Sequence, residues 1–165
     1  MSKKQKKSAK KTDDGRRIIA ENRKARHKYE VLDTLECGIA LQGSEVKSLR
    51  LGKVSLDESY GRVREGELWL VGCDIAEYPQ ATQFNHEPKR PRKLLIHRRE
   101  LSKFASQAHE KGLTLVPLKL YFNERSKVKL LLGLCRGRKL YDKREVKKKA
   151  EVKRDLDRAI KSRAR

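Results

Sequence analysis

The chain has 165 residues, of which 43 are Lys or Arg and 22 are Asp or Glu, so its formal net charge is +21. Charged residues make up 39% of the sequence and hydrophobic residues 36%, which suits one small folded domain with polar extensions. No stretch approaches the roughly 18 apolar residues that span a bilayer, and the Lys-rich start lacks the apolar segment of a secretion signal. We therefore expect a soluble, cytoplasmic protein that does not contact membranes.

The positive charge is concentrated at the two ends of the chain. Residues 1–28 carry 12 basic and 3 acidic side chains and residues 136–165 carry 14 and 5, whereas the residues between them carry 17 and 14. Nearly all large apolar residues lie in this middle part. The sequence thus predicts a disordered basic arm over 1–21, a folded domain over 22–135, and a basic tail over 136–165. The tail is expected to be disordered alone and helical on a partner that supplies counter-charge.

The first predicted element is a long strand from Tyr29 to Leu41. Apolar residues occupy alternate positions along it, while Glu36 and its polar neighbours fall on the other face. Asp33 breaks the alternation, and Gly38 is expected to form a bulge or bend. This pattern predicts a strand with one face in the core and one face in water.

A short helix and a hairpin should follow. Ser44 is placed to cap a helix that runs through Leu51, with Gly52 as its left-handed end. Two strand-like runs then surround Glu65 and Gly66, and the second run carries Trp69, which predicts a β-hairpin. Residues 77–93 contain three prolines and several basic residues, so we expect a long loop there.

The remaining elements are one helix and two strands. Apolar residues recur every three or four positions over 98–111, which predicts a helix with His97 at its N-cap and Gly112 as its stop. The runs 113–122 and 127–135 read as apolar strands joined by a turn at 123–126. A mainly β fold, an OB-like small antiparallel β-barrel with two or three peripheral helices, accounts for this order, because closure removes exposed strand edges.

The charge favours a nucleic acid partner. Phosphate backbones attract dense positive charge, and RNA is preferred over DNA because the predicted barrel resembles RNA-binding modules and nothing resembles a DNA-recognition helix. A structural ribosomal or ribosome-assembly protein is one alternative. A small Mg²⁺-dependent nuclease is another, for which the candidate metal ligands are Asp57, Glu58 and Asp74.

Other catalytic or metal chemistry has little support in the sequence. The four histidines are scattered, and no Gly-rich phosphate loop is present. Cys37, Cys73 and Cys135 are widely spaced and form no Cys-x-x-Cys pair, so they read as reduced, mostly buried thiols rather than zinc ligands. We expect no catalytic activity, no cofactor and no resident metal.

Three segments resemble a known family. They are NRKARHKYEVLDTLECGIALQGSEVKSLR from Asn22, KRPRKLLIHRREL from Lys89 and GRKLYDKRE from Gly137. In order and spacing they resemble the small protein B (SmpB) family, whose members accompany transfer-messenger RNA (tmRNA) in bacterial ribosome rescue. The resemblance implies an oligonucleotide-binding barrel that grips the tRNA-like domain of tmRNA, with one monomer per tmRNA. It also implies a tail that enters the decoding centre and mRNA channel of a stalled ribosome, so that the stalled peptide is tagged for degradation.

The resemblance also implies which residues contact tmRNA. Glu36 is the most distinctive of them, because a carboxylate accepts hydrogen bonds from base edges or ribose hydroxyls and is repelled by phosphates. An ordinary intramolecular ion pair is the alternative for Glu36, and a place in the core is the alternative for Leu95. The implied tmRNA-binding residues are Asn22, Arg26, His27, Glu36, Arg92, Lys93, Leu95 and His97. A solvated basic face is the alternative for Asn22, Arg26, His27, Arg92 and Lys93.

A second implied set lies in the tail. Tyr141 is expected to stack on a ribosomal base, or alternatively to anchor the tail against the barrel. The lysines and arginines are expected to follow ribosomal RNA phosphates. The implied ribosome-binding residues are Gly137, Tyr141, Asp142, Lys143, Arg144, Lys147, Lys148, Lys149, Lys153 and Arg154.

Overall fold

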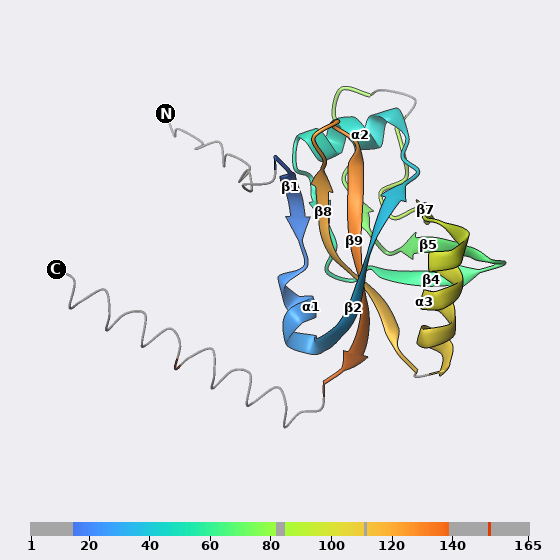
Figure 1. Ribbon diagram of the computed structural model, residues 1–165. Coiled ribbons are helices and arrows are strands. Elements are labelled where there is room, and N and C mark those ends of the chain that lie inside the picture. Colours follow the sequence, from blue (N-terminus) through green and yellow to red (C-terminus); the bar gives the residue numbers. More distant parts are fainter. Residues whose placement is uncertain (1–14, 82–84, 111, 139–151, 153–165) are drawn as a thin grey trace.

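A computed structural model describes residues 15–81, 85–110, 112–138 and 152. These residues form a mainly β structure with three helices (Figure 1). The elements in chain order are β1 (Arg17–Glu21), α1 (Arg23–Lys28), β2 (Tyr29–Ile39), α2 (Gly43–Arg50), β3 (Val54–Ser55), β4 (Tyr60–Arg64), β5 (Glu67–Val71), β6 (Asp74–Ile75), β7 (Arg92–Leu95), α3 (Arg98–Glu110), β8 (Thr114–Phe122) and β9 (Val128–Gly137).

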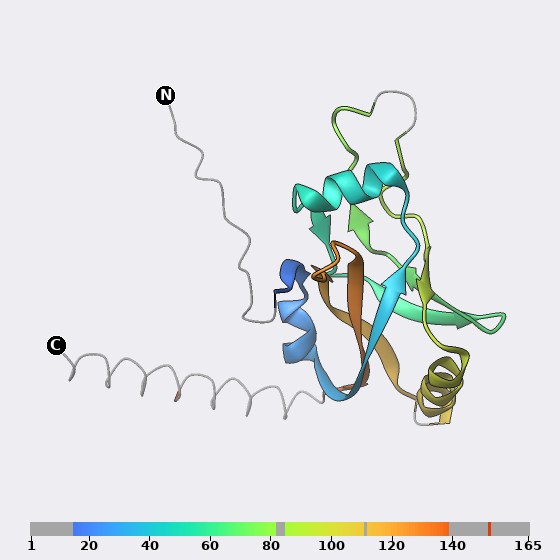
Figure 2. The same ribbon diagram turned by 45° about the horizontal axis from the view of Figure 1, so that its top comes forward.

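The main sheet closes on itself. Its strands pair in the order β8, β4, β5, β7, β2 and β9, and β9 pairs in turn with β8, so they form a ring in which every pairing is antiparallel. β1 pairs with β8 on the edge opposite β9, and β3 pairs with β6 in a separate small sheet. Figures 1 and 2 show α2 across one end of the ring and α3 beside the opposite end. The predicted mainly β, antiparallel fold is therefore confirmed.

The core fills the inside of the ring. Leucines from β5, β8 and β9 are fully or almost fully buried there, together with Phe104 of α3. The three cysteines are buried and free, as predicted, and burial raises the pKa of the Cys37 thiol to about 12. In the described part of the chain, no helix is long and apolar enough to cross a bilayer.

Two glycines allow the strands to approach closely. A Cβ on Gly61 would lie 2.8 Å from the Cβ of Leu115, and a Cβ on Gly133 would lie 2.9 Å from the Cδ1 of Leu118. Gly61 and Leu115 are the paired residues where β4 meets β8. A side chain at residue 61 would therefore push these strands apart at the point where the ring closes.

β2 follows the predicted alternation only from Asp33 onward, and its bulge is elsewhere. Cys37 and Leu35 point into the core, while Glu36 faces outward. The register with β9 shifts between Val31 and Asp33, so the extra residue is Leu32. Tyr29 and Val31 therefore pack against a second apolar cluster that includes Ala25 and Cys135, and not with Leu35 and Cys37 as predicted. The prediction of a bulge at Gly38 is wrong: Gly38 pairs with both Leu95 of β7 and Lys129 of β9.

The start of α2 also differs from the prediction. The Ser44 hydroxyl does not cap the helix but lies 3.0 Å from Nδ1 of His86. Instead, the carboxylate of Glu45 accepts a hydrogen bond of 2.6 Å from the backbone amide of Gln42. Gly52 has a positive φ of 72°, as a left-handed helix end requires.

The hairpin and the third helix agree with the sequence. Glu65 and Gly66 have φ values of 52° and 72°, as in the two-residue turns that join antiparallel strands. α3 begins at Arg98, its first hydrogen bond runs from the Leu101 amide to the His97 carbonyl, and Gly112 follows it with a φ of 56°.

The boundaries of the folded part need correction at both ends. Residues 17–21 are not part of a disordered arm, because β1 pairs with β8. At the other end β9 continues to Gly137, and the amide of Arg138 donates to the carbonyl of Lys28. The predicted loop over 77–93 ends earlier, because Arg92 begins β7. The other parts of the predicted arm and tail lie outside the described residues, apart from residues 15, 16 and 152.

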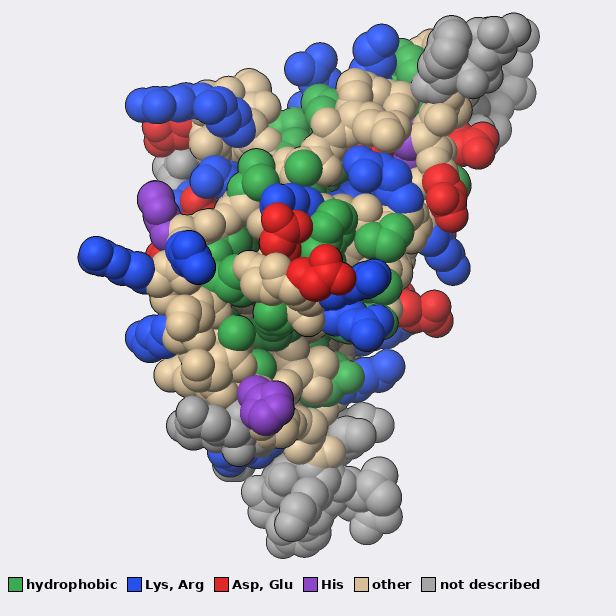
Figure 3. Space-filling model, turned by 90° about the vertical axis from the view of Figure 1, so that its right-hand side faces the viewer, with side chains coloured by type: hydrophobic (Ala, Val, Ile, Leu, Met, Phe, Trp, Pro, Cys, Tyr) green, Lys and Arg blue, Asp and Glu red, His purple; other side chains and the backbone are tan. Residues whose placement is uncertain are grey.

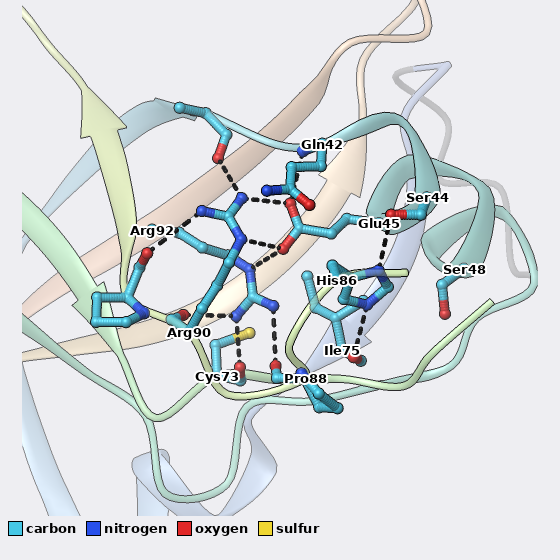
Figure 4. A network of polar contacts seen from close by, with 12 residues as sticks. Gln42, Ser44, Glu45, Ser48, Cys73, Ile75, His86, Pro88, Arg90 and Arg92 are labelled. Carbon is cyan, nitrogen blue, oxygen red and sulfur yellow. Dashed lines mark hydrogen bonds and ion pairs between the residues drawn. The ribbon is translucent and has the colours of Figure 1, made fainter. Parts of the chain in front are cut away.

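A buried ionic cluster joins α2 to β7 (Figure 4). Oε1 of Glu45 accepts from Nε of Arg92 at 2.8 Å and from Nε of Arg90 at 2.9 Å, and Oε2 accepts from Nη2 of Arg90 at 2.6 Å. The side chains of Glu45 and Arg92 are fully buried. Burial alone would raise the pKa of Glu45, but the hydrogen bonds from Arg90, the Gln42 amide and Arg92 together lower it.

The same cluster holds the proline-containing segment that precedes β7. Nη1 of Arg92 donates to the carbonyl of Cys73 at 2.6 Å, and Nη2 donates to the carbonyl of Pro88 at 2.9 Å. His86 is also buried, with Nε2 3.0 Å from the Ile75 carbonyl. A segment with few ladder hydrogen bonds is thus fixed by side chains, which satisfy its backbone carbonyls.

We predict that Glu45→Gln lowers the free energy of unfolding by about 3–5 kcal/mol, because it leaves the Arg92 guanidinium buried without a counter-charge. Urea denaturation followed by circular dichroism measures this change. Glu65→Gln is the matched control: its ion pair with Arg64 is exposed, so a change within about 1 kcal/mol is expected. A loss of less than 1 kcal/mol for Glu45→Gln would contradict the structural role of the cluster.

Candidate RNA interface

Glu36 lies on the outer face of the ring, where β2 runs beside β9. Its side chain is 42% exposed, its Oε2 accepts a hydrogen bond from the Tyr121 hydroxyl, and its Oε1 lies 3.5 Å from Nζ of Lys129. The guanidinium of Arg16 stands 5.4 Å from the centre of the Tyr121 ring. Glu36 therefore has the intramolecular ion pair that was weighed as an alternative, and it also remains open to a ligand.

These neighbours keep the carboxylate charged. The hydrogen bond from Tyr121 lowers the pKa of Glu36, and the positive charge of Lys129 acts in the same direction. Burial and the same hydrogen bond raise the pKa of Tyr121 to about 12, so its hydroxyl stays a donor. Glu36 thus presents a fixed, ionised acceptor on the outside of the ring.

Leu95 is part of the same outer face and not of the core. It is 53% exposed and pairs with Gly38, whose missing side chain leaves room for it. A Cβ on Gly38 would lie 3.2 Å from the Cβ of Leu95. Because Gly38 is two residues from Glu36 on one strand, the carboxylate and the exposed leucine share one surface.

Two further predicted residues lie next to this surface. His97 is exposed just before α3, two residues after Leu95. Nζ of Lys93 donates to Oε1 of Glu67 at 2.5 Å, and its side chain is 43% exposed. We name the outer face around Glu36, Leu95 and His97 the acidic–apolar surface.

Two residues predicted to contact RNA are structural instead. Arg92 is fully buried against Glu45, so its guanidinium is not available to a ligand. Asn22 is 3% exposed: its oxygen accepts from the Ala25 amide at 3.0 Å, and its nitrogen donates to the Leu56 carbonyl at 3.1 Å. Asn22 is the N-cap of α1 and anchors that helix to the rest of the fold.

Arg26 and His27 are exposed on α1, at a distance from Glu36. They precede the start of β2, and the seven residue steps from Tyr29 to Glu36 extend for roughly 23 Å in a strand. The predicted tmRNA-binding residues that are exposed thus form two surfaces, one acidic and apolar and one basic. The exposed basic residues of α1 are Arg23, Lys24, Arg26, His27 and Lys28.

Of the residues predicted to form the tail site, the structure describes only the first, Gly137. Gly137 pairs with Tyr29 at the end of β9, so it belongs to the sheet. The other predicted tail residues, from Tyr141 to Arg154, lie outside the described residues.

The three acids weighed as nuclease ligands line one pocket, together with three lysines. Asp57, Glu58 and Asp74 are its acidic members, and Nζ of Lys24 lies 2.6 Å from Oδ2 of Asp57. Among the described residues, no group of three His, Cys, Asp or Glu side chains is arranged to hold a metal ion. One of the three acids, Asp57, is instead paired with a lysine ammonium.

The sequence alone did not identify the partners of Glu36. Tyr121 and Lys129 come from β8 and β9 and face each other across that pair. Lys129 interrupts an apolar run at a position that alternates with the buried Leu130, which marks it as outward-facing. Tyr121 stands in a run that is apolar on both faces, so no comparable signal distinguishes it.

A closed antiparallel ring with a basic helix and an exposed carboxylate on its outside is an arrangement typical of RNA-binding modules. The model of the SmpB protein family matches residues 19–162. An SsrA-binding protein from Rhodopirellula baltica is 59% identical over 142 residues, which cover 86% of this chain and 81% of the relative. The chain belongs to the SmpB family.

Two further relatives extend the likeness. An SsrA-binding protein from Rhodopseudomonas palustris is 52% identical over 155 residues, which cover 94% of this chain and 99% of that protein. A chain in a solved structure described as "tmRNA-SmpB: a journey to the center of the bacterial ribosome" has a TM-score of 0.63 and 55% identity. That match covers 73% of this chain and 85% of the other.

We predict that Tyr121→Phe raises the pKa of Glu36 toward its ordinary value, because the hydroxyl that stabilises the ionised form is removed. Carbon-detected NMR of the Glu side-chain carboxyl groups over a pH titration measures the shift. The folded-state pKa is depressed, so the hydrogen bond stabilises the protein above the ordinary Glu pKa and is lost as the pH falls through the lowered one. An unchanged Glu36 pKa in Tyr121→Phe would contradict this assignment.

Proposed function

We propose that this protein is a noncatalytic RNA-binding adaptor of trans-translation: it binds the tRNA-like domain of tmRNA and brings it to stalled ribosomes in the cytoplasm. The observation that carries the proposal is the ionised, half-exposed Glu36 beside the exposed Leu95, on a chain of net charge +21 that belongs to the SmpB family. The relatives named SsrA-binding proteins, together with the solved structure whose description names tmRNA and SmpB, support tmRNA as the partner. We propose one monomer per tmRNA, with no cofactor, no DNA and no membrane as partner.

The two surfaces of the ring are suited to different tasks. The basic residues of α1 attract phosphates of any RNA, and such contacts supply affinity without sequence information. Glu36 repels phosphates, so it favours an RNA that presents a hydrogen-bond donor at that place, such as a base edge or a ribose 2′-hydroxyl. Leu95 adds an apolar contact beside it. In this proposal the basic surface provides attraction and the acidic–apolar surface provides selection.

The tail has a different task in the proposal. β9 ends beside α1, where the backbone amide of Arg138 donates to the carbonyl of Lys28. Residues 139–165 span at most about 90 Å when extended. The tail is therefore long enough to reach a site well away from the ring. We propose that Tyr141 stacks in the vacant decoding centre and that the lysines from Lys147 onward follow the mRNA channel.

The alternative of a structural ribosomal protein makes a different prediction about amounts. An adaptor copurifies substoichiometrically with one tRNA-like RNA, whereas a ribosomal protein occurs at one copy per subunit. The names of the relatives favour the adaptor.

We predict that Glu36→Ala weakens binding of tmRNA by about 1–3 kcal/mol, as expected for a lost charge-assisted hydrogen bond. Binding of an unrelated RNA of equal length should hardly change. Fluorescence anisotropy of labelled RNAs gives both affinities. Glu124→Ala removes an exposed carboxylate from the turn between β8 and β9 and is the charge-matched control. Equal losses for both RNAs would contradict a selective role for Glu36.

We predict that truncation after Arg138 keeps tmRNA affinity at low salt within about tenfold, yet abolishes tagging, because the ring and α1 are retained. A reconstituted translation reaction stalled on an mRNA without a stop codon measures tagging. Full tagging by the truncated chain would contradict the role of the tail. A much larger loss of tmRNA affinity would show that the tail belongs to the RNA grip.

A further inference from the structure

A second surface on the ring combines an aromatic side chain with cations. On the outer face of β4, β5 and β7, Trp69 lies between two basic residues: Arg62 is its cross-strand partner on β4, and Lys93 is its partner on β7. The indole is partly buried, so the sheet fixes its position, yet it is still accessible. Residues directly opposite on one face of a sheet have side chains in contact range.

Trp69 lines an open pocket of about 340 Å³. Figure 3 shows the side of the molecule toward which the β4–β5 hairpin points, with basic, acidic and hydrophobic side chains close together near its centre. Pro91 and Val71 provide the apolar border of the pocket, and the hairpin residues provide its charged border. The full lining is Arg62, Arg64, Glu65, Glu67, Trp69, Val71 and Pro91.

The two acidic side chains of the pocket have ionic partners, whereas one of its arginines has none in the described part of the chain. Glu67 is paired with Lys93, and Glu65 is paired with Arg64 at 3.2 Å. The side chain of the exposed Arg62 makes no hydrogen bond or ion pair within the described residues. Among those residues, neither Arg62 nor Lys93 lies over the Trp69 ring. One cation without a partner in that part of the chain and a partly exposed indole therefore line the same pocket.

We propose that this pocket binds an unpaired nucleobase of RNA, which stacks on Trp69 while Arg62 contacts an adjacent phosphate. Aromatic side chains beside cationic ones are the usual platform for single-stranded RNA, since every base has a π-face and every nucleotide a phosphate. A base inside a duplex is covered by its neighbours and cannot reach the indole. The ligand is thus a loop or single-stranded nucleotide.

The pocket continues the acidic–apolar surface. Lys93 and Leu95 are two residues apart on β7 and face the same side, so an RNA seated on Leu95 passes close to Trp69. The inference rests on the proposed function in that the RNA is the one recognised by Glu36. A protein partner seated on Trp69 would be a different ligand, and the experiment below separates the two.

The composition of the chain provides a direct readout, because Trp69 is its only tryptophan. The full-length protein is titrated with an eight-nucleotide oligoadenylate and with an abasic oligomer of the same length and charge. We expect the oligoadenylate to quench tryptophan fluorescence at concentrations about five to 100 times lower than the abasic oligomer, since only bases stack. Equal quenching by both oligomers, or quenching by neither, would overturn the proposal.

Variants test the two named side chains separately. Arg62→Ala should raise the half-quenching concentration several-fold, whereas Arg125→Ala, which removes an exposed arginine from the β8–β9 turn, should leave it unchanged. In anisotropy with labelled tmRNA, Trp69→Phe should keep most of the affinity and Trp69→Leu should lose it about tenfold, because Phe retains a ring. Equal affinities for the Phe and Leu variants would overturn the stacking role, provided circular dichroism shows both folded.

The failure of this proposal is distinguishable from failure of the proposed function. Tight tmRNA binding without a change in Trp69 fluorescence overturns the pocket as a base site and leaves the adaptor function intact. Base-dependent quenching by oligoadenylate without preference for tmRNA supports the pocket and contradicts the adaptor function.

Discussion

The buried ion pair of Glu45 with Arg92 fixes β7, the strand that carries Leu95 of the acidic–apolar surface and pairs with Trp69 of the second pocket. Along β7 the side chains alternate: Arg92 and Leu94 point inward, while Lys93 and Leu95 point outward. A shift of one residue in register would exchange these faces. Arg92 points inward and contacts Glu45 together with the Cys73 and Pro88 carbonyls, so a one-residue shift would break all three contacts. A buried ion pair adds little net stability over apolar packing, and its role here is to specify a unique arrangement.

In the proposed function, the distribution of charge over the outside of the ring separates affinity for RNA from selectivity among RNAs. Basic side chains on α1 act on every phosphate backbone, and their contribution falls as salt rises. Glu36 works against this attraction, and the Tyr121 hydroxyl keeps it ionised where a neutral acid would be less repulsive to phosphate. In the proposed function, an RNA that places a donor at Glu36 is favoured over one that places a phosphate there. A chain with so much positive charge needs such a device to distinguish one RNA from the rest.

The sequence pattern predicted those helices, strands and turns that are determined by neighbouring residues. The Glu65–Gly66 turn and the three- to four-residue period of α3 are properties of neighbouring residues, and both are confirmed. The alternation in β2 is confirmed only beyond its bulge, because the extra residue puts Tyr29 and Val31 in a different cluster from Leu35 and Cys37. β7 was missed because its four residues follow prolines and lysines, and it becomes a strand through β5, β2 and a carboxylate 47 residues upstream. β1 was missed for a similar reason, since its partner β8 lies about a hundred residues later. The resemblance to the SmpB family implies an RNA contact for Arg92 and Asn22, because a matched polar residue gives no sign of the long-range partners that bury it.

The most direct test of the whole account is ultraviolet crosslinking of the intact protein in cells, followed by sequencing of the RNA and mapping of the crosslinked residues. The account predicts that one tRNA-like RNA with an mRNA-like segment is strongly enriched, with crosslinks at the outer face around Glu36, Leu95 and Trp69. Recovery of ribosomal RNA alone, at one protein per subunit, or crosslinks confined to the basic ends of the chain, would contradict it.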